Sequence, residues 1–507
     1  MTAQARTLTN NVEQHWVISM LVIIVGAFMA ILDSSIINIA IPTLMHVFEV
    51  STEEVQWVVT IYMLTLGVVV PTSGWLGDKW GYKKLYILSL VTFTIGSILC
   101  GLAWNLNVMI AARVIQALGG GMIMPTTMSI IFRIVPKNRL GTAMGFWGMA
   151  LLVAPALGPT LGGYLVEYLN WRLIFYINVP IGILGFFLCL IVLPEFDSPD
   201  PQPFDFIGFL TSSVGLFTLL LAFSKGEAWG WTAQPTVLLF YTSIISLGIF
   251  VYNELTIEHP MLELRIFKYG MFTASKVVGM VTMVSMYVGI FYLPLFLQNI
   301  RGLGAMETGL LLMPGALVTG LMMPISGRIY DKIGALPLTV AGIIVLSYTT
   351  FLLSNLAVGT ASTTIIKWVV LRGIGMGLVM MPAQTAGMAV IPQRYVGQAS
   401  AISNVIQRVS SSFGLTLLTT YLTGRVAFHR TVYSAEINPW SEAVQQLMAK
   451  FGSAGEAVGA TKQLLMGSLQ GIIAQKAFVR GIDELFIMTA LFCLIGLIPS
   501  LFLKRVK

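Results

Sequence analysis

The stretch GWLGDKWGYKK, residues 74–84, decides the fold because the chain carries a second copy of its pattern. Residues 74–81 read G-x-x-x-D-K-x-G, and GRIYDKIG at residues 327–334 reads the same way, 253 residues later. Each copy follows a long apolar run, so each lies at the end of a predicted membrane helix. The repeated motif therefore indicates two related halves.

A second pair of segments supports this duplication. MPTTMSIIFRIVPKNRLGTA at residues 124–143 parallels MPAQTAGMAVIPQRYVGQA at residues 381–399, with offsets of 256 to 257 residues. Both pairs occur in the same order, which predicts a duplicated unit of about six helices. Parallel repeats of this kind occur in membrane transporters that alternate between two open states.

The composition is that of a polytopic membrane protein. Of 507 residues, 56% are hydrophobic and only 10% are charged, whereas soluble proteins carry about 25% charged residues. Apolar runs near the length that crosses a bilayer recur along the chain. We predict an all-α fold with fourteen spans, near 17–41, 55–77, 84–103, 107–132, 140–166, 172–193, 205–223, 235–253, 271–297, 308–328, 336–354, 363–388, 397–423 and 482–503.

These spans divide into three parts. Residues 1–193 form a six-helix bundle, residues 194–268 form a linker with two inserted spans, and residues 269–507 form a second six-helix bundle with a long outer loop at 424–481. Lysines and arginines gather in the short loops on the side of the N-terminus, and such loops are cytoplasmic. Both termini are therefore expected in the cytoplasm.

Three further motifs carry a family resemblance. LDSSIINIAIP (residues 32–42), RVIQALGGG (113–121) and APALGPTLGG (154–163) accompany the loop motif, in which Trp80 replaces a frequently basic residue. The whole chain resembles the fourteen-helix drug:proton antiporters of the major facilitator superfamily, the EmrB/QacA type. The resemblance implies proton-coupled multidrug efflux across a bacterial inner membrane and, in a Gram-negative host, a periplasmic membrane-fusion protein as partner.

Asp33 is the main candidate for proton coupling. A carboxylate at membrane depth costs several kcal/mol and normally serves a function. Arg113 is expected at a similar depth, and the first and fourth spans should face one cavity. An ion pair or near-pair would offset the cost of both charges, and a proton or a cationic substrate could cancel the carboxylate charge. A permanent structural pair is the alternative. Asn38 and Gln116 belong to the same two motifs and complete this candidate site.

The repeated loop motif is the candidate gate on the cytoplasmic side. Asp78 and its lysine neighbours supply charge, and the glycines allow close contact and a tight turn. A topology signal is the alternative. Because the second copy is less complete, we expect a smaller role for its aspartate. The gating set comprises Gly74, Asp78, Gly81, Lys83 and Lys84, with Gly327, Asp331 and Gly334 in the second copy.

Prolines and glycines crowd the fifth predicted span. They bend a helix and permit close packing, so we expect a hinge or a tight proton seal rather than packing alone. The residues are Pro155, Gly158, Pro159, Gly162 and Gly163. In the second half, Arg372, Asn404 and Arg408 are polar candidates within apolar runs, and the sequence names no partner for them.

The sequence contains no nucleotide-binding, metal-protease or serine-hydrolase motif. We therefore expect neither an enzyme nor a bound cofactor or metal, and no nucleic-acid partner. Abundant aromatic and methionine side chains suit a cavity for varied amphipathic compounds. We predict a proton-driven exporter of amphipathic or lipophilic compounds, cationic or aromatic. Exporters of a lipid, siderophore or peptide, and a non-transporting membrane sensor, stay open as alternatives.

Overall fold

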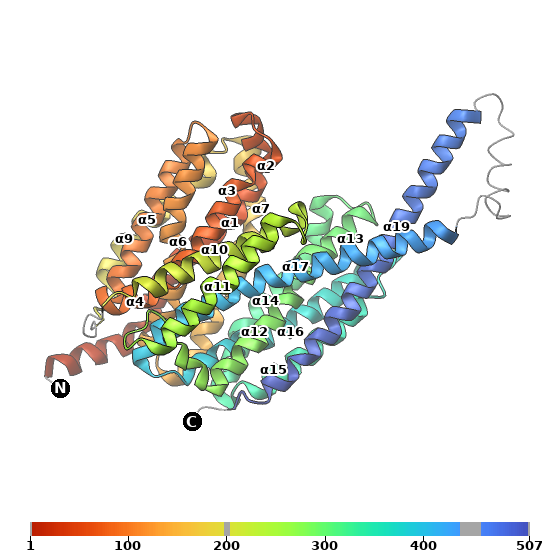
Figure 1. The fold of residues 1–507 in the computed structure, drawn as a ribbon. Helices are drawn as coiled ribbons and strands as arrows, with labels where there is room; N and C mark the ends of the chain where they lie inside the picture. Colours follow the sequence, from red (N-terminus) through yellow and green to blue (C-terminus); the bar gives the residue numbers. More distant parts are fainter. Residues whose placement is uncertain (1–2, 197–202, 437–457, 505–507) are drawn as a thin grey trace.

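The computed structural model describes residues 3–196, 203–436 and 458–504, and every regular element in these ranges is a helix (Figure 1). The first half holds α1 (Ala3–Phe48), α2 (Thr52–Val55), α3 (Trp57–Val69), α4 (Thr72–Trp80), α5 (Tyr82–Leu102), α6 (Leu106–Ile134), α7 (Leu140–Tyr168), α8 (Leu173–Tyr176) and α9 (Asn178–Val192). Next come α10 (Phe206–Trp229) and α11 (Gln234–Thr256). The second half holds α12 (Gly270–Tyr287), the π-helical turn η3 (Val288–Tyr292), α13 (Leu293–Asn299), α14 (Ala305–Ile333), α15 (Leu336–Leu353), α16 (Ser362–Ala389), α17 (Val396–Glu436), α19 (Val458–Ile495) and α20 (Leu497–Ser500).

Twelve of the described helical stretches are long and apolar enough to cross a membrane. A thirteenth span is the pair Thr52–Val69 and Thr72–Trp80, which bends by 55° at the break. The remaining predicted span, 397–423, falls on α17, whose inner turns carry polar side chains such as Asn404 and Arg408. The all-α fold is confirmed, while the count of fourteen stays a prediction.

The two halves stand beside each other, and both ends of the chain lie at the same end of the molecule (Figure 1). We call this end the terminal side and the opposite end the distal side. Helix α7 of the first half packs along α14 of the second, and α17 packs on α4 and α6. The inserted helices α10 and α11 pair, with α10 also against α3 and α17. The domain boundaries at residues 193 and 268 stay predictions.

The predicted outer loop at 424–481 needs correction. Helix α17 continues to Glu436 and α19 already begins at Val458, so much of this segment is a pair of helices that projects on the distal side (Figure 1). Charged side chains of α17 are paired with Glu484 of α19. Arg425 bonds Glu484, and His429 Nε2 lies 3.0 Å from Glu484 Oε1. Within this segment, SEAVQQLMAKF at residues 441–451 has the apolar spacing that predicts an amphipathic helix, and these residues lie outside the described part of the chain.

Candidate functional site

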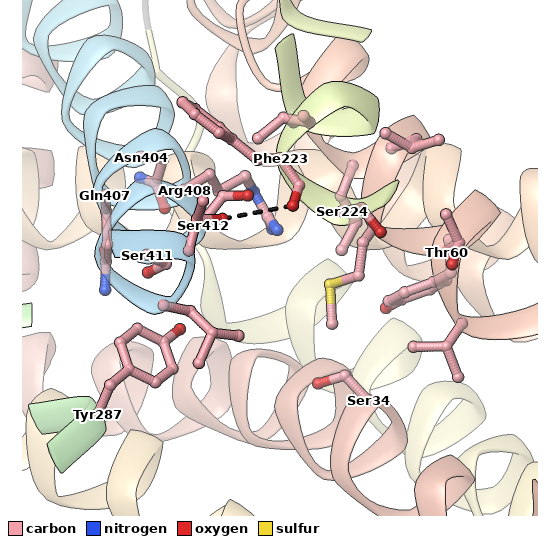
Figure 2. Close-up of a pocket in the computed structure, with 18 of the residues that line it drawn as sticks. Ser34, Thr60, Phe223, Ser224, Tyr287, Asn404, Gln407, Arg408, Ser411 and Ser412 are labelled. Carbon is pink, nitrogen blue, oxygen red and sulfur yellow. Dashed lines mark hydrogen bonds between the residues drawn. The ribbon is translucent and has the colours of Figure 1, made fainter. Parts of the chain in front are cut away.

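A cavity of about 640 Å³ lies between the two halves, with walls from α1, α3, α6, α10, α12 and α17 (Figure 2). This volume falls within the range of small-molecule sites, about 300–1,000 Å³. Its first-half wall is largely apolar, with Ile31, Met63 and Met124, while α17 supplies amides and hydroxyls such as Gln407 and Ser411. The cavity extends towards Trp231, just beyond the distal end of α10.

Among the described residues, Arg408 and Glu227 are the only charged side chains of the cavity wall. Figure 2 shows Arg408 reaching from α17 into the cavity beside Ser412. Asn404, on the same helix, also lines the cavity and donates its Nδ2 to the Ser400 carbonyl at 2.9 Å. Within the described ranges, no carboxylate oxygen lies within 4.0 Å of the Arg408 guanidinium. The structure thus places both second-half candidates of α17 at the cavity.

Asp33 and Arg113 form an ion pair next to this cavity. Arg113 Nη1 lies 2.7 Å from Asp33 Oδ2. Arg113 is 0% exposed and Asp33 is 3% exposed. Gln116 donates its Nε2 to Asp33 Oδ1 at 2.8 Å, and its Oε1 accepts from Arg113 at 2.6 Å. The structure therefore brings together three of the four residues predicted for this site.

Two further polar residues complete the cluster and were missed in the sequence. Asn178, at the start of α9, donates its Nδ2 to Asp33 Oδ1 at 2.8 Å. The Ser97 hydroxyl accepts hydrogen bonds from Gln116 at 2.7 Å and from Asn178 at 2.9 Å. Their only signal was a neutral polar residue within an apolar run, and such residues are common in membrane helices. We name Asp33, Ser97, Arg113, Gln116 and Asn178 the buried polar cluster.

The helices that carry Asp33 and Arg113 face one cavity, as expected, through Ser34 of α1 and Met124 of α6. The two charged side chains pair with each other behind the cavity wall and are not part of it. Three donors saturate the carboxylate, which permits its burial away from water. Tyr62 connects the two regions, because it lines the cavity and its ring centre lies 3.9 Å from Arg113 Cζ.

Asn38 does not join the cluster, which corrects its place among the candidates. It lies five residues after Asp33, about 140° around the helix at 100° per residue. Its side chain is exposed and donates only to the Ser34 carbonyl, at 3.3 Å. It therefore neither touches the carboxylate nor lines the cavity.

The proline- and glycine-rich segment of α7 packs against α1 beside Asp33. A Cβ at Gly158 would clash with the Ser35 side chain, whose Cβ would be 2.7 Å away, and one at Gly162 would lie 3.2 Å from Ile36 Cγ2. Ser35 Oγ also donates to the Pro155 carbonyl at 3.3 Å. Helix α7 continues through Pro155 and Pro159 without a break. A Cβ at Gly163 would meet no atom of another element within 4 Å, so this glycine takes no part in the contact.

The first copy of the loop motif lies at the terminal side and contacts the second half through a glycine. A Cβ at Gly74 would lie 3.0 Å from the Gln398 Cα of α17. Asp78 accepts the Tyr82 hydroxyl at 2.8 Å and lies 3.7 Å from Arg133. These two partners belong to the first half itself.

The glycine and the two lysines at the end of this first copy have separate contacts. Gly81 ends α4 with φ of 85°, a left-handed conformation that favours glycine. Lys83 Nζ lies 3.2 Å from Glu195 and donates to the Leu190 carbonyl at 3.1 Å. Lys84 is exposed. The lysines thus do not pair with Asp78.

The second copy bridges the halves directly. Asp331 accepts the Gly141 N–H at 2.8 Å, the Thr142 N–H at 2.9 Å and the Thr142 hydroxyl at 2.6 Å, so it caps the N-terminus of α7. Gly327 packs on the Gly141 carbonyl, and Gly334 ends α14 with φ of 85°. The halves are therefore joined at the terminal side, and the central cavity lies distal to this junction.

Arg372 lies outside both the cavity and the buried polar cluster. Its Nη1 donates to Thr350 Oγ1 at 2.6 Å, and its Nη2 donates to the Ser285 carbonyl. Thr350 follows Ser97 by 253 residues, the offset of the loop motif. The second half thus has counterparts of the Ser97 hydroxyl and of the buried cation. Among the described residues, it has no carboxylate within 4.0 Å of that cation.

Two helical halves, a cavity between them and a junction at one end are the arrangement of a membrane transporter. A family model for the Major Facilitator Superfamily matches residues 23–415. The chain belongs to this superfamily.

Its relatives agree with this assignment. The chain is 36% identical to an uncharacterized MFS-type transporter, YhcA, of Bacillus subtilis, over 96% of this chain and 93% of that one. It is 31% identical to the lincomycin resistance protein LmrB of Listeria monocytogenes, over 96% of each. The solved structure of the proton:xylose symporter XylE has a TM-score of 0.58 at 14% identity, covering 94% of this chain and 95% of that one. That likeness concerns the fold.

Proposed function

We propose that this transporter exports amphipathic or lipophilic compounds in exchange for protons, as a multidrug efflux protein of a bacterial inner membrane with both termini in the cytoplasm. The observation that carries the proposal is the Asp33–Arg113 pair, buried beside the cavity and separated from it by Tyr62. Drug export is also suggested by the name of the lincomycin resistance relative.

Protonation of Asp33 would change the wall of the cavity. A neutral carboxyl group holds Arg113 much less strongly than a carboxylate does. The guanidinium would then shift against the Tyr62 ring that it now faces at 3.9 Å. A compound that presses on Tyr62 would, by reciprocity, change the free energy of protonating Asp33. Coupling therefore runs through the tyrosine, with no direct contact between substrate and carboxylate in this conformation.

The same site connects mechanically to the junction on the terminal side. Asp33 lies two residues from Ser35, which packs on Gly158 of α7. The N-terminus of α7 is the group that Asp331 of the other half caps. A shift of α1 upon protonation would thus reach the junction through one rigid helix. Breaking this junction would open the cavity to the terminal side.

The cavity favours aromatic and apolar compounds. Tyr62, Phe223, Trp231 and Tyr287 line it together with Met63. The cationic substrates expected from the sequence find one acid, Glu227, at the distal end and one arginine deeper inside. Lipid, siderophore or peptide export stays an alternative, and a membrane-fusion partner stays a prediction.

Transport by purified protein in proteoliposomes tests the proposal. With an imposed proton gradient, the wild type should move lincomycin against its concentration gradient and should dissipate the proton gradient at the same time. Asp33→Asn should abolish uphill movement, because a permanently neutral amide cannot exchange a proton. Asp33→Glu should keep part of the activity. Uphill transport by Asp33→Asn at the wild-type rate would contradict the role of Asp33. Proton coupling would be contradicted if the proton gradient drove wild-type transport of none of the compounds in a drug panel.

A further inference from the structure

A second, smaller cavity of about 50 Å³ lies between the halves, and it contains a buried cation. Lys276 of α12 lines it and is 6% exposed. Trp147 and Leu151 of α7 form the opposite wall, and methionines such as Met380 complete it. Gln407 of α17 borders both this cavity and the central one, so the two adjoin.

Lys276 lacks a counter-charge. Its Nζ donates to Gln384 Oε1 at 3.0 Å, which uses one of the three N–H donors of the ammonium group. Throughout the described part of the chain, no carboxylate oxygen lies within 4.0 Å of this nitrogen. A charged side chain in a membrane helix is expensive unless it is paired or serves a function.

Lys276 and Arg408, the two cations that line these cavities without a carboxylate partner in the described residues, lie at different depths of one path. Lys276 is six residues from the start of α12, about 9 Å from its end, and Arg408 is twelve residues from the start of α17, about 18 Å, at 1.5 Å per residue. Both helices start at the terminal side and belong to the second half. The two side chains therefore offer positive charge first near the terminal side and then in the central cavity.

We infer that Lys276 and Arg408 are two successive binding sites for an anionic group, and that the exported compounds include amphipathic anions with an aromatic body. This inference rests on the proposed export function. Lys276 would hold the anion when the cavity opens to the terminal side, because separation of α7 from α12 widens the smaller cavity. Arg408 would hold it in the distal-facing conformation described here. The methionine and aromatic walls would contact the apolar body.

Three matched probes test this inference: 1-pyrenebutyrate, 1-pyrenebutanol and 1-pyrenebutylamine, which share a ring system and differ in charge. Binding is measured by energy transfer from protein tryptophans to pyrene, with full-length protein in nanodiscs and empty nanodiscs as blank. The wild type should bind the butyrate about tenfold more tightly than the alcohol, with the amine weakest. Arg408→Gln and Lys276→Met should each lower the butyrate-to-alcohol affinity ratio at least threefold, and the double variant should abolish it.

Charge-keeping and remote variants serve as controls. Lys276→Arg and Arg408→Lys should retain most of the preference, and Lys367→Met, an exposed position of α16 outside both cavities, should retain all of it. Equal loss of butyrate and alcohol binding in the neutral variants would overturn the inference and make both cations structural. Absence of butyrate-selective binding in the wild type would also overturn it. Selective binding without gradient-driven transport would support the anion sites and contradict proton-driven export instead.

Discussion

Asp33 is held by three side chains of two helices, Arg113 and Gln116 of α6 and Asn178 of α9, and all are buried. Each donor stabilises the charged form of the carboxylate. The pair of charges could be predicted, because an acid and an arginine in apolar runs are rare and demand partners. Asn178 and Ser97 could not, since neutral polar side chains in membrane helices frequently bond their own backbone. Only the packing of α5, α6 and α9 selects them.

At this scale we predict that Asn178→Ala lowers proton-driven transport about tenfold without unfolding the protein. A hydrogen bond to a charged group contributes about 1.5–3 kcal/mol, and its loss would leave Ser97 and the carboxylate each short of a donor. The measurement is initial transport rate in proteoliposomes, normalised to folded protein. Asn38→Ala is the matched control, because Asn38 is exposed and bonds only its own helix; its rate should stay within twofold of the wild type. Equal rates for both variants would exclude Asn178 from the coupling site.

Among the elements, α7 belongs to the first half and also packs against helices of the second half. It packs on α1 through Gly158 and along α14. At its N-terminus, backbone N–H groups donate to the capping carboxylate of Asp331. The sequence predicted the span and its small residues, but it could not show which glycines face a neighbour. Gly158 and Gly162 do, whereas Gly163 does not. The predicted spans 397–423 and 482–503 cover only part of α17 and α19. The pairing of Arg425 with Glu484 could not be predicted, because it depends on the two helices lying together.

For α7 we predict that Gly158→Ala lowers both thermal stability and transport, because the new Cβ would be 2.7 Å from Ser35 Cβ. Overpacking of a tight contact costs about 1–3 kcal/mol. Gly163→Ala should be neutral or slightly stabilising, since that position is open and alanine favours a helix. Unfolding temperature in detergent and transport rate are measured together. Adding Ser35→Gly to Gly158→Ala should restore at least half of the lost stability. A double variant no more stable than Gly158→Ala would show that the loss arises away from the α1 contact.

The whole molecule is built from two halves whose junction is asymmetric in detail. The repeat in the sequence predicted both copies of the loop motif and their shared place at helix ends. It also suggested a smaller role for Asp331, because the second copy is shorter. The geometry supports the reverse order, since Asp331 makes three hydrogen bonds across the halves. Asp78 bonds Tyr82 and lies near Arg133, both within its own half, and its one neighbour across the halves among the described residues is the Gln398 side chain.

We therefore predict that Asp331→Asn opens the terminal side more than Asp78→Asn does. The amide keeps one acceptor oxygen but places an NH2 group against N–H donors of α7, and it removes the negative charge at a helix N-terminus. Loss of such a cap costs about 0.5–2 kcal/mol, which corresponds to roughly a twofold to thirtyfold shift towards the open state.

The probe is a cysteine at Gly279, which lines the smaller cavity and where an added Cβ would meet nothing within 4 Å. The three natural cysteines are buried and are replaced by serine. A membrane-impermeant maleimide applied from the terminal side should label Gly279→Cys about fivefold faster with Asp331→Asn and less than twofold faster with Asp78→Asn. If Asp78→Asn accelerates labelling as much or more, the first copy of the motif holds the junction, and the hydrogen bonds of Asp331 are secondary to the contact of Gly74 with α17.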